Sequence, residues 1–94
     1  MITYLFHLLD QHYNELSKTQ KIICTYVREH YLDLPYLSIA ALGEKIGVSV
    51  GSITGFCKAL GFEGFGDFQK ELQKIAQQEL FSMREIKNSI AEAS

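Results

Sequence analysis

Apolar residues recur at intervals of three and four positions along most of this chain, which is the period of an amphipathic α-helix. The pattern predicts a helix over residues 2–13, two short helices between Ser38 and Leu60, and a long helix over residues 65–80. Another helix of about fourteen residues begins at Ser17, because Ser-x-x-Gln is a capping box. With one proline, seven glycines and no Asn-Gly or Asp-Gly pair, β-hairpins are not expected. We therefore expect an all-α fold, a compact helical bundle of about five helices.

The same spacing gives each of the first two helices a core-facing side. In the first helix this side carries Ile2, Leu5, Phe6, Leu9 and Tyr13. In the second it carries Ile22, Ile23, Tyr26, Val27 and Tyr31. The first helix either completes its own core or packs against a partner. The second ends before Leu34-Pro35, because a residue that precedes proline disfavours the α region.

The segment from Ser38 to Phe62 predicts a helix-turn-helix, in which the second helix is offered to the DNA major groove. Gly47 can adopt the left-handed conformation that a short turn between helices demands. Ser38 and Ser49 are expected to cap the two helices through free backbone amides. Gly43 carries no side chain, so the second helix can cross closely over the first.

The composition predicts one intracellular domain. The chain has 94 residues, 47% of them apolar, and no apolar run long enough to span a membrane. The first ten residues lack the basic start and the cleavage site of a signal peptide. Cys24 and Cys57 lie on apolar helix faces without CxxC spacing, and we expect buried free thiols in a reducing cytoplasm.

The net charge of −2 is unusual for a DNA-binding domain, which commonly carries a basic excess. Residues 17–75 hold seven basic and six acidic side chains and so carry +1, while the flanks carry the acidic surplus. Because phosphate neutralisation supplies most non-specific affinity, this domain alone is expected to bind DNA weakly.

Nothing in the sequence indicates an enzyme, a metal site or a cofactor. His7, His12 and His30 are scattered, and there is no HExxH motif, Cys/His cluster or glycine-rich phosphate loop. His30 with Glu29 and Asp33 could form a small metal or acid–base cluster, although a solvated helix C-terminus explains these residues better.

The run from Leu37 to Leu72 resembles the N-terminal domain of the RpiR family of bacterial transcriptional regulators. The resemblance rests on F-C-x-x-L-G-F-x-G-F-x-D-F, found here from Phe56 to Phe68, and extends more loosely back to Leu16. It implies a winged or elaborated helix-turn-helix that binds operator DNA as a homodimer. In the family, a C-terminal SIS domain senses a phosphosugar and tunes that binding. Such a domain is absent from these 94 residues, so they are either an N-terminal fragment or a standalone module, and we expect the fragment.

The chain departs from the family pattern in the helix expected to contact bases. Val50, Gly51 and Ser52 stand where the family usually has Glu-Ala-Thr, and Gly55 replaces a common arginine. Ala59 and Glu63 also replace commonly basic residues, which leaves Lys58 as the one charge of this helix. Since each interior glycine costs a helix about 1 kcal/mol relative to alanine, we expect this helix to fray in the free protein and to become ordered on DNA or through dimer packing.

Each candidate DNA-contacting residue also has an ordinary structural interpretation. Ser38 and Ser49 serve as caps, and the Ser49 hydroxyl could also touch a phosphate. Ser52 and Thr54 fill the surface or contact bases or phosphates. Gly51 and Gly55 are tolerated on the surface or admit close approach of DNA. The complete candidate set is Lys18, Lys21, Ser38, Lys45, Ser49, Val50, Gly51, Ser52, Thr54, Gly55 and Lys58.

The lysines of this set are exposed by default, yet each could reach a phosphate once the domain is docked. Lys18 and Lys21 stand at the start of a helix whose free amides also attract phosphate. A basic stripe that joins these two lysines to Lys45 and Lys58 would favour DNA binding, whereas scattered lysines would favour protein association. Phe62, Phe65 and Phe68 are expected in the core rather than in a base-stacking platform.

Two functions remain open from the sequence. The first is the DNA-binding domain of a cytoplasmic RpiR-like regulator, with residues 1–80 as the domain and 81–94 as a helical extension or linker. Its partners would be double-stranded operator DNA and a second copy of the chain, with no membrane, and a phosphosugar effector only through the absent domain. The second is a helix-turn-helix module that has lost DNA affinity and mediates protein–protein association.

Overall fold

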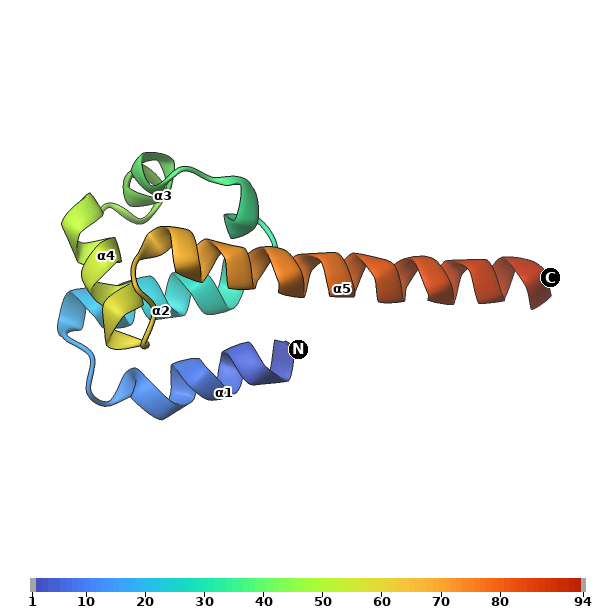
Figure 1. Cartoon of the computed structure of the whole chain (residues 1–94), viewed down its shortest axis with the longest axis horizontal. Helices are drawn as coiled ribbons and strands as arrows, with labels where there is room; N and C mark the ends of the chain where they lie inside the picture. Colours follow the sequence, from blue (N-terminus) through green and yellow to red (C-terminus); the bar gives the residue numbers. More distant parts are fainter. Residues whose placement is uncertain (1, 94) are drawn as a thin grey trace.

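The computed structural model describes residues 2–93, and their side chains from Tyr4 to Glu79. Helices account for nearly all of the regular structure in this range, which contains no strand and so confirms the all-α prediction. The elements shown in Figure 1 are α1 (Ile2–Tyr13), α2 (Lys18–His30), the 3₁₀ turn η1 (Leu34–Tyr36), α3 (Ile39–Ile46), α4 (Val50–Ala59) and α5 (Phe65–Ala93).

The predicted helix caps are confirmed. Ser17 Oγ accepts a hydrogen bond from Gln20 N at 3.2 Å, and Gln20 Oε1 accepts one from Ser17 N at 2.9 Å, which completes the capping box of α2. Ser38 Oγ caps α3 by accepting from Ala41 N at 3.1 Å. Serine therefore fixes the start of α2 and of α3.

The α3–α4 connection has the predicted glycine geometry. Gly47 adopts φ +83°, and its amide donates to Gly43 O at 2.8 Å; Val48 N donates to the same oxygen at 3.0 Å. A Cβ built on Gly43 would lie 2.9 Å from Val48 O, so only glycine fits here without a shift of the turn. Ser49 then begins α4 and accepts a bond from Ser52 N. This compact turn fixes how α4 leaves α3.

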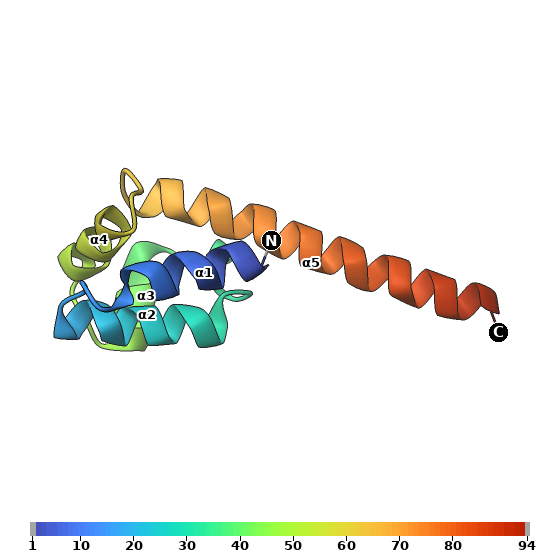
Figure 2. The ribbon, with the colours of Figure 1, turned by 90° about the horizontal axis from the view of Figure 1, so that it is seen from below.

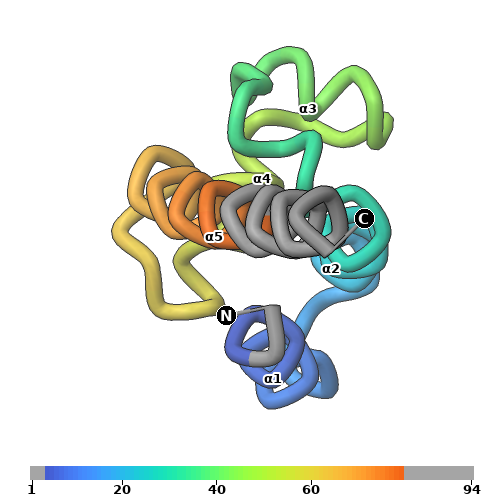
Figure 3. Tube along the Cα trace, turned by 90° about the vertical axis from the view of Figure 1, so that its right-hand side faces the viewer, coloured from blue at the N-terminus to red at the C-terminus, as the bar shows by residue number. Residues whose placement is uncertain are grey.

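The core draws on every helix. Figure 3 shows α1 and α3 on opposite sides of α2 and α5, and α2 contacts α1, α3 and α4. Leu5 and Leu9 are fully buried, so α1 completes the core of its own chain. Phe68 is buried, and Phe62 and Phe65 pack against the core, as predicted. The other central side chains are Ile23, Val27, Leu42, Ile53, Phe56, Leu72 and Ile75.

Two core predictions are wrong. The spacing places Tyr13 on the core side of α1 and Ile22 on that of α2, but they are 39% and 49% exposed. Consecutive helical residues lie about 100° apart, and Ile23, which is fully buried, occupies the core direction. Ile22 instead lines a shallow groove between α2 and α3, together with Tyr26 and Lys45.

The last helix is longer than predicted. The spacing suggested an end near residue 80, whereas α5 continues to Ala93 and extends beyond the other helices in Figures 1 and 2. Residues 81–93 are therefore a helical extension. Near its start, Gln69 Nε2 donates to Leu37 O at 2.6 Å and to Leu34 O at 3.2 Å, which ties η1 to α5. The side chains of Ile2 and of residues 80–94 lie outside the described part.

Candidate nucleic-acid interface

Helix α4 has one buried face and one solvent-facing face. Ile53, Phe56 and Cys57 are buried, with at most 1% of each side chain exposed. At about 100° per residue, the opposite face carries Gly51, Gly55 and Lys58 with Thr54 at its edge, while Val50, about 60° from Ile53, is exposed at the first turn of the helix. Figures 1 and 2 show α4 at the end of the molecule where α5 begins, so the long helix leads away from it. This face is open to a large partner.

Hydroxyl groups at the start of α4 are already engaged within the helix. Ser49 Oγ accepts from Ser52 N at 3.1 Å and lies 2.8 Å from Ser52 Oγ. Since one of these two hydroxyls donates to the other, the second keeps a free proton that a phosphate oxygen can accept. Thr54 Oγ1 donates to Val50 O at 3.2 Å, which uses its only proton and leaves an acceptor and a methyl group.

The first turn of α2 lies against the middle of α4. A Cβ built on Gly55 would be 3.6 Å from Gln20 Nε2, an ordinary contact distance. Lys18, the first residue of α2, is exposed two positions before Gln20. The structure thus brings the first turn of α2 next to Gly55 of α4.

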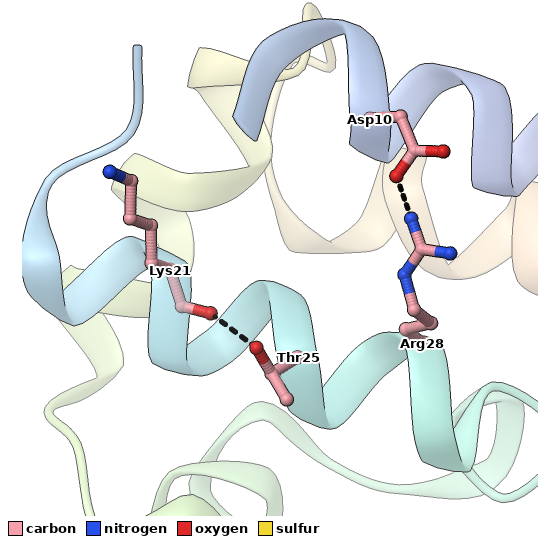
Figure 4. Close-up of polar contacts among 4 residues, drawn as sticks. All are labelled: Asp10, Lys21, Thr25 and Arg28. Atoms are coloured by element: carbon pink, nitrogen blue, oxygen red, sulfur yellow. Dashed lines mark hydrogen bonds and ion pairs between the residues drawn. The ribbon is translucent and has the colours of Figure 1, made fainter. Parts of the chain in front are cut away.

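Two of the candidate lysines lie in other surroundings. Lys21 extends toward the α1–α2 connection, as Figure 4 shows, with its Nζ 5.2 Å from the centre of the Tyr13 ring. Lys45 is exposed in the last turn of α3 and lines the α2–α3 groove beside Glu29. The four lysines lie in different surroundings, so the single basic stripe expected to favour DNA binding over protein association is not observed among them; Lys58 is the lysine of α4 itself. Ser38 stands at the start of α3 as its cap.

Gln20 was missed as a member of this site. The sequence identified it only as half of a capping box, whereas its amide also lies against Gly55 of α4. Gly55 is the signal that could have revealed it, since a glycine within a helix often marks a place where another part of the chain approaches closely.

Other candidate chemistry has structural explanations. Both cysteines are free and buried. Burial raises the pKa of the Cys57 thiol to about 12 and also raises that of Cys24, so neither is activated as a nucleophile. His30 stacks on Tyr26 and lies 3.8 Å from Asp33 at the exposed end of α2. Among the side chains that the structure describes, no three potential metal ligands come together.

One ion pair between the described side chains links α1 to α2. Arg28 pairs with Asp10, as Figure 4 shows, and its guanidinium lies 4.9 Å from the centre of the Phe6 ring. Such partly exposed pairs contribute little individually. Arg28 is therefore committed to packing rather than to DNA.

The comparison with protein families decides the identity of the fold. The model of the rpiR-family helix-turn-helix domain matches residues 3–79, which is most of the chain. The chain belongs to the rpiR family. Its helix-turn-helix is accordingly that of a transcriptional regulator's DNA-binding domain, and the family resemblance of Phe56 to Phe68 is confirmed.

Curated relatives of this rpiR-family domain are themselves regulators. An uncharacterised HTH-type transcriptional regulator of Clostridium perfringens is 36% identical over 58 residues, which cover 62% of this chain and 21% of the relative. The HTH-type transcriptional regulator GlvR of Bacillus subtilis is 34% identical over 65 residues, which cover 69% of this chain and 26% of GlvR. The chain therefore matches about a quarter or less of each of these relatives.

A solved structure shares the fold of this rpiR-family domain. The NanR protein of Vibrio vulnificus, solved in complex with ManNAc-6P, superimposes with a TM-score of 0.74 and 22% sequence identity. The likeness covers 84% of this chain and 30% of NanR. No helix within the described residues is long and apolar enough to cross a membrane.

Proposed function

We propose that this domain binds operator DNA by placing the outward face of α4 in the major groove, while the first turn of α2 holds the phosphate backbone. The observation that carries the proposal is that a Cβ built on Gly55 would lie 3.6 Å from Gln20 Nε2, which sets the first turn of α2 beside α4. In helix-turn-helix proteins the second helix meets base edges and the first crosses the backbone. Here α4 is the second helix of the motif and α3 the first, and we propose that the first turn of α2 adds contacts to the backbone.

Phosphate contacts in this proposal come from cations and free hydroxyl protons. Lys18 is exposed at the start of α2 and Lys58 in the last turn of α4, and the Ser49–Ser52 pair keeps one donor free. Lys45 and the capped start of α3 at Ser38 are the next nearest groups along the helix-turn-helix. Lys21 would first have to leave the Tyr13 ring, so its contribution is the smallest.

Base contacts would come from Val50, Ser52 and Thr54. Gly51 and Gly55 assist by letting the helix backbone approach the groove, since a Cβ on Gly51 would meet only Ser49 Oγ at 3.9 Å. Of the two glycines, Gly51 faces more open space. Ser52 and Thr54 offer single hydrogen bonds rather than bidentate ones.

We also propose that the functional protein is a cytoplasmic homodimer. Weak affinity of a single domain with net charge −2 is compensated when two copies bind two half-sites, and two-fold symmetry then requires an inverted repeat. Residues 1–80 form the DNA-binding unit in this proposal, and the extension of α5 leads from it. An effector would bind outside these 94 residues. NanR, which shares the fold, was solved with a phosphosugar, and a phosphosugar is our proposal for this protein as well.

The test is selection from a pool of random duplexes at two salt concentrations. We expect enrichment of an inverted repeat, with affinity that falls steeply as salt rises. If Lys18, Lys45 and Lys58 each neutralise one phosphate, the logarithm of affinity falls with the logarithm of salt by about 3 per domain. Lys18→Gln and Lys58→Gln should each reduce that slope by about 1.

The matched control for charge is Lys74→Gln, which removes a lysine of α5 that lies 3.9 Å from Glu71. It should leave the salt slope unchanged. A fusion of this domain to a known dimeriser should also enrich an inverted repeat. If the fusion enriches no sequence, the proposal is refuted and protein–protein association, the other function that the sequence allows, is favoured.

A further inference from the structure

The outward face of α4 offers an unusual set of groups for reading bases. From Val50 to Ala59 the helix contains no arginine, asparagine, glutamine, aspartate or glutamate. Bidentate pairing of arginine with guanine, or of asparagine or glutamine with adenine, is the usual basis of direct readout in the major groove. Lysine can also pair with guanine, and Lys58 at the far end of α4 is the one residue of the helix of any of these types, so specificity at the first turn must rest on smaller groups.

Hydrogen bonding removes a further donor from the face. Thr54 gives its hydroxyl proton to Val50 O, so toward a base it can present only an acceptor and a methyl group. Ser49 and Ser52 share their hydroxyls at the first turn, where one proton remains. Lys58 stands two turns beyond Val50, at the other end of the helix. The beginning of the face is therefore mainly apolar and uncharged.

Val50 is the residue of this region that packing does not explain. Val50 is the first residue of α4 and is 44% exposed. It has no capping role, because the side chain of Ser49 accepts the hydrogen bond from the Ser52 amide. A β-branched side chain is also a poor choice for an exposed helical position. Its apolar surface adjoins Gly51, where a Cβ would meet only the Ser49 hydroxyl, so no side chain shields it from that side.

We propose that Val50 determines operator specificity by packing its side chain on the 5-methyl group of a thymine in each half-site. The inference rests on the proposed function, because it assumes that α4 enters the major groove. Among the four bases only thymine carries a methyl group at that edge, and apolar side chains contact it. The Thr54 methyl, one turn along, extends the same apolar row. The ligand is thus a half-site with an A·T pair opposite the first turn of α4.

Single replacement of thymine by deoxyuridine tests this contact. The selected operator is synthesised with one thymine at a time changed in both half-sites, which removes a methyl group and keeps base pairing. Binding is measured by fluorescence anisotropy with the wild-type domain in the dimeric form that selected the site. One thymine position should weaken binding about fourfold per half-site, the effect of exposing about one buried methyl group.

Two variants assign the effect to Val50. Val50→Ala should bind the thymine operator more weakly and should no longer distinguish thymine from deoxyuridine at that position. Ile22→Ala is the matched control, since it truncates an exposed aliphatic side chain in the α2–α3 groove, away from the α4 face. It should retain the full discrimination. Circular dichroism confirms that both variants are folded.

The possible results distinguish a failure of thymine readout by Val50 from a failure of DNA binding by α4. If deoxyuridine at every position leaves the affinity for the selected operator unchanged, the thymine readout is overturned and DNA binding by α4 still stands. The same conclusion follows if Val50→Ala discriminates thymine from deoxyuridine as well as the wild type does. Failure to select any site, even with the dimerised domain, would overturn the proposed function and the readout together.

Discussion

Gly43→Ala tests whether the close α3–α4 turn depends on the missing side chain. The added Cβ would lie 2.9 Å from Val48 O, a backbone atom that cannot rotate away. The Gly43 carbonyl also accepts bonds from the amides of Gly47 and Val48, so a shift of the turn would strain both. We expect the substitution to displace the start of α4 and to lower the free energy of unfolding.

The magnitude follows from comparison with Gly51→Ala. Both substitutions gain the same helix propensity, about 1 kcal/mol, but a Cβ on Gly51 meets only Ser49 Oγ at 3.9 Å. The difference between the two variants therefore isolates the cost of the contact, which for overpacking is about 1–3 kcal/mol. Gly51→Ala should stabilise the domain by about 0.5–1 kcal/mol, and Gly43→Ala should be the less stable of the pair.

Urea unfolding followed by circular dichroism at one protein concentration measures this difference, with thermal midpoints as a second readout. For a domain of this size, 1 kcal/mol corresponds to about 4–8 °C. Equal stability of Gly43→Ala and Gly51→Ala would refute the steric argument. If Gly43→Ala unfolds with the same free energy as the wild type or a higher one, the turn accommodates a side chain without loss of stability.

Other predictions concern α4 itself. Ser49→Ala removes the cap on Ser52 N and should cost about 1 kcal/mol in urea unfolding; a cost near zero would mean that water replaces the cap fully. Native-state hydrogen exchange should be fast over Val50–Gly55, because two glycines weaken this part of the helix, and strong protection there would refute the expected fraying. Cys57 should resist alkylation until the domain unfolds, since its thiol is buried. Because burial raises its pKa from 9.0 to about 12, the unfolded thiol ionises first, so stability should fall as pH rises from 9 toward 12, and less so in Cys57→Ala.

Local features were the ones that the sequence predicted best. Ser17, Ser38 and Ser49 cap helices because a serine hydroxyl can satisfy a free amide within three residues, which requires no knowledge of the fold. Gly43 and Gly47 were likewise predictable, since a short turn between packed helices demands a left-handed residue and a close approach.

Features that depend on long-range packing were missed. Ile22 and Ile23 are equally apolar, and only the position of α3 and α4 decides which of them is buried. The hydrogen bonds from Gln69 to the carbonyl oxygens of Leu34 and Leu37 join residues more than thirty positions apart, so no local sequence pattern predicts them. The lysines were all predicted as exposed, but the Tyr13 ring that holds Lys21 belongs to another segment. The candidate interface on α4 therefore stays a prediction, and the surroundings of its lysines required the structure.

Amide chemical-shift mapping by NMR, during titration of the domain with its selected half-site duplex, tests most directly whether α4 and the α2 N-terminus meet DNA. The account predicts the largest changes over residues 17–20 and 49–58, with small changes along α1, which lies on the opposite side of α2 and α5 from α3. Changes centred on α1 or on η1, with α4 unaffected, would contradict it.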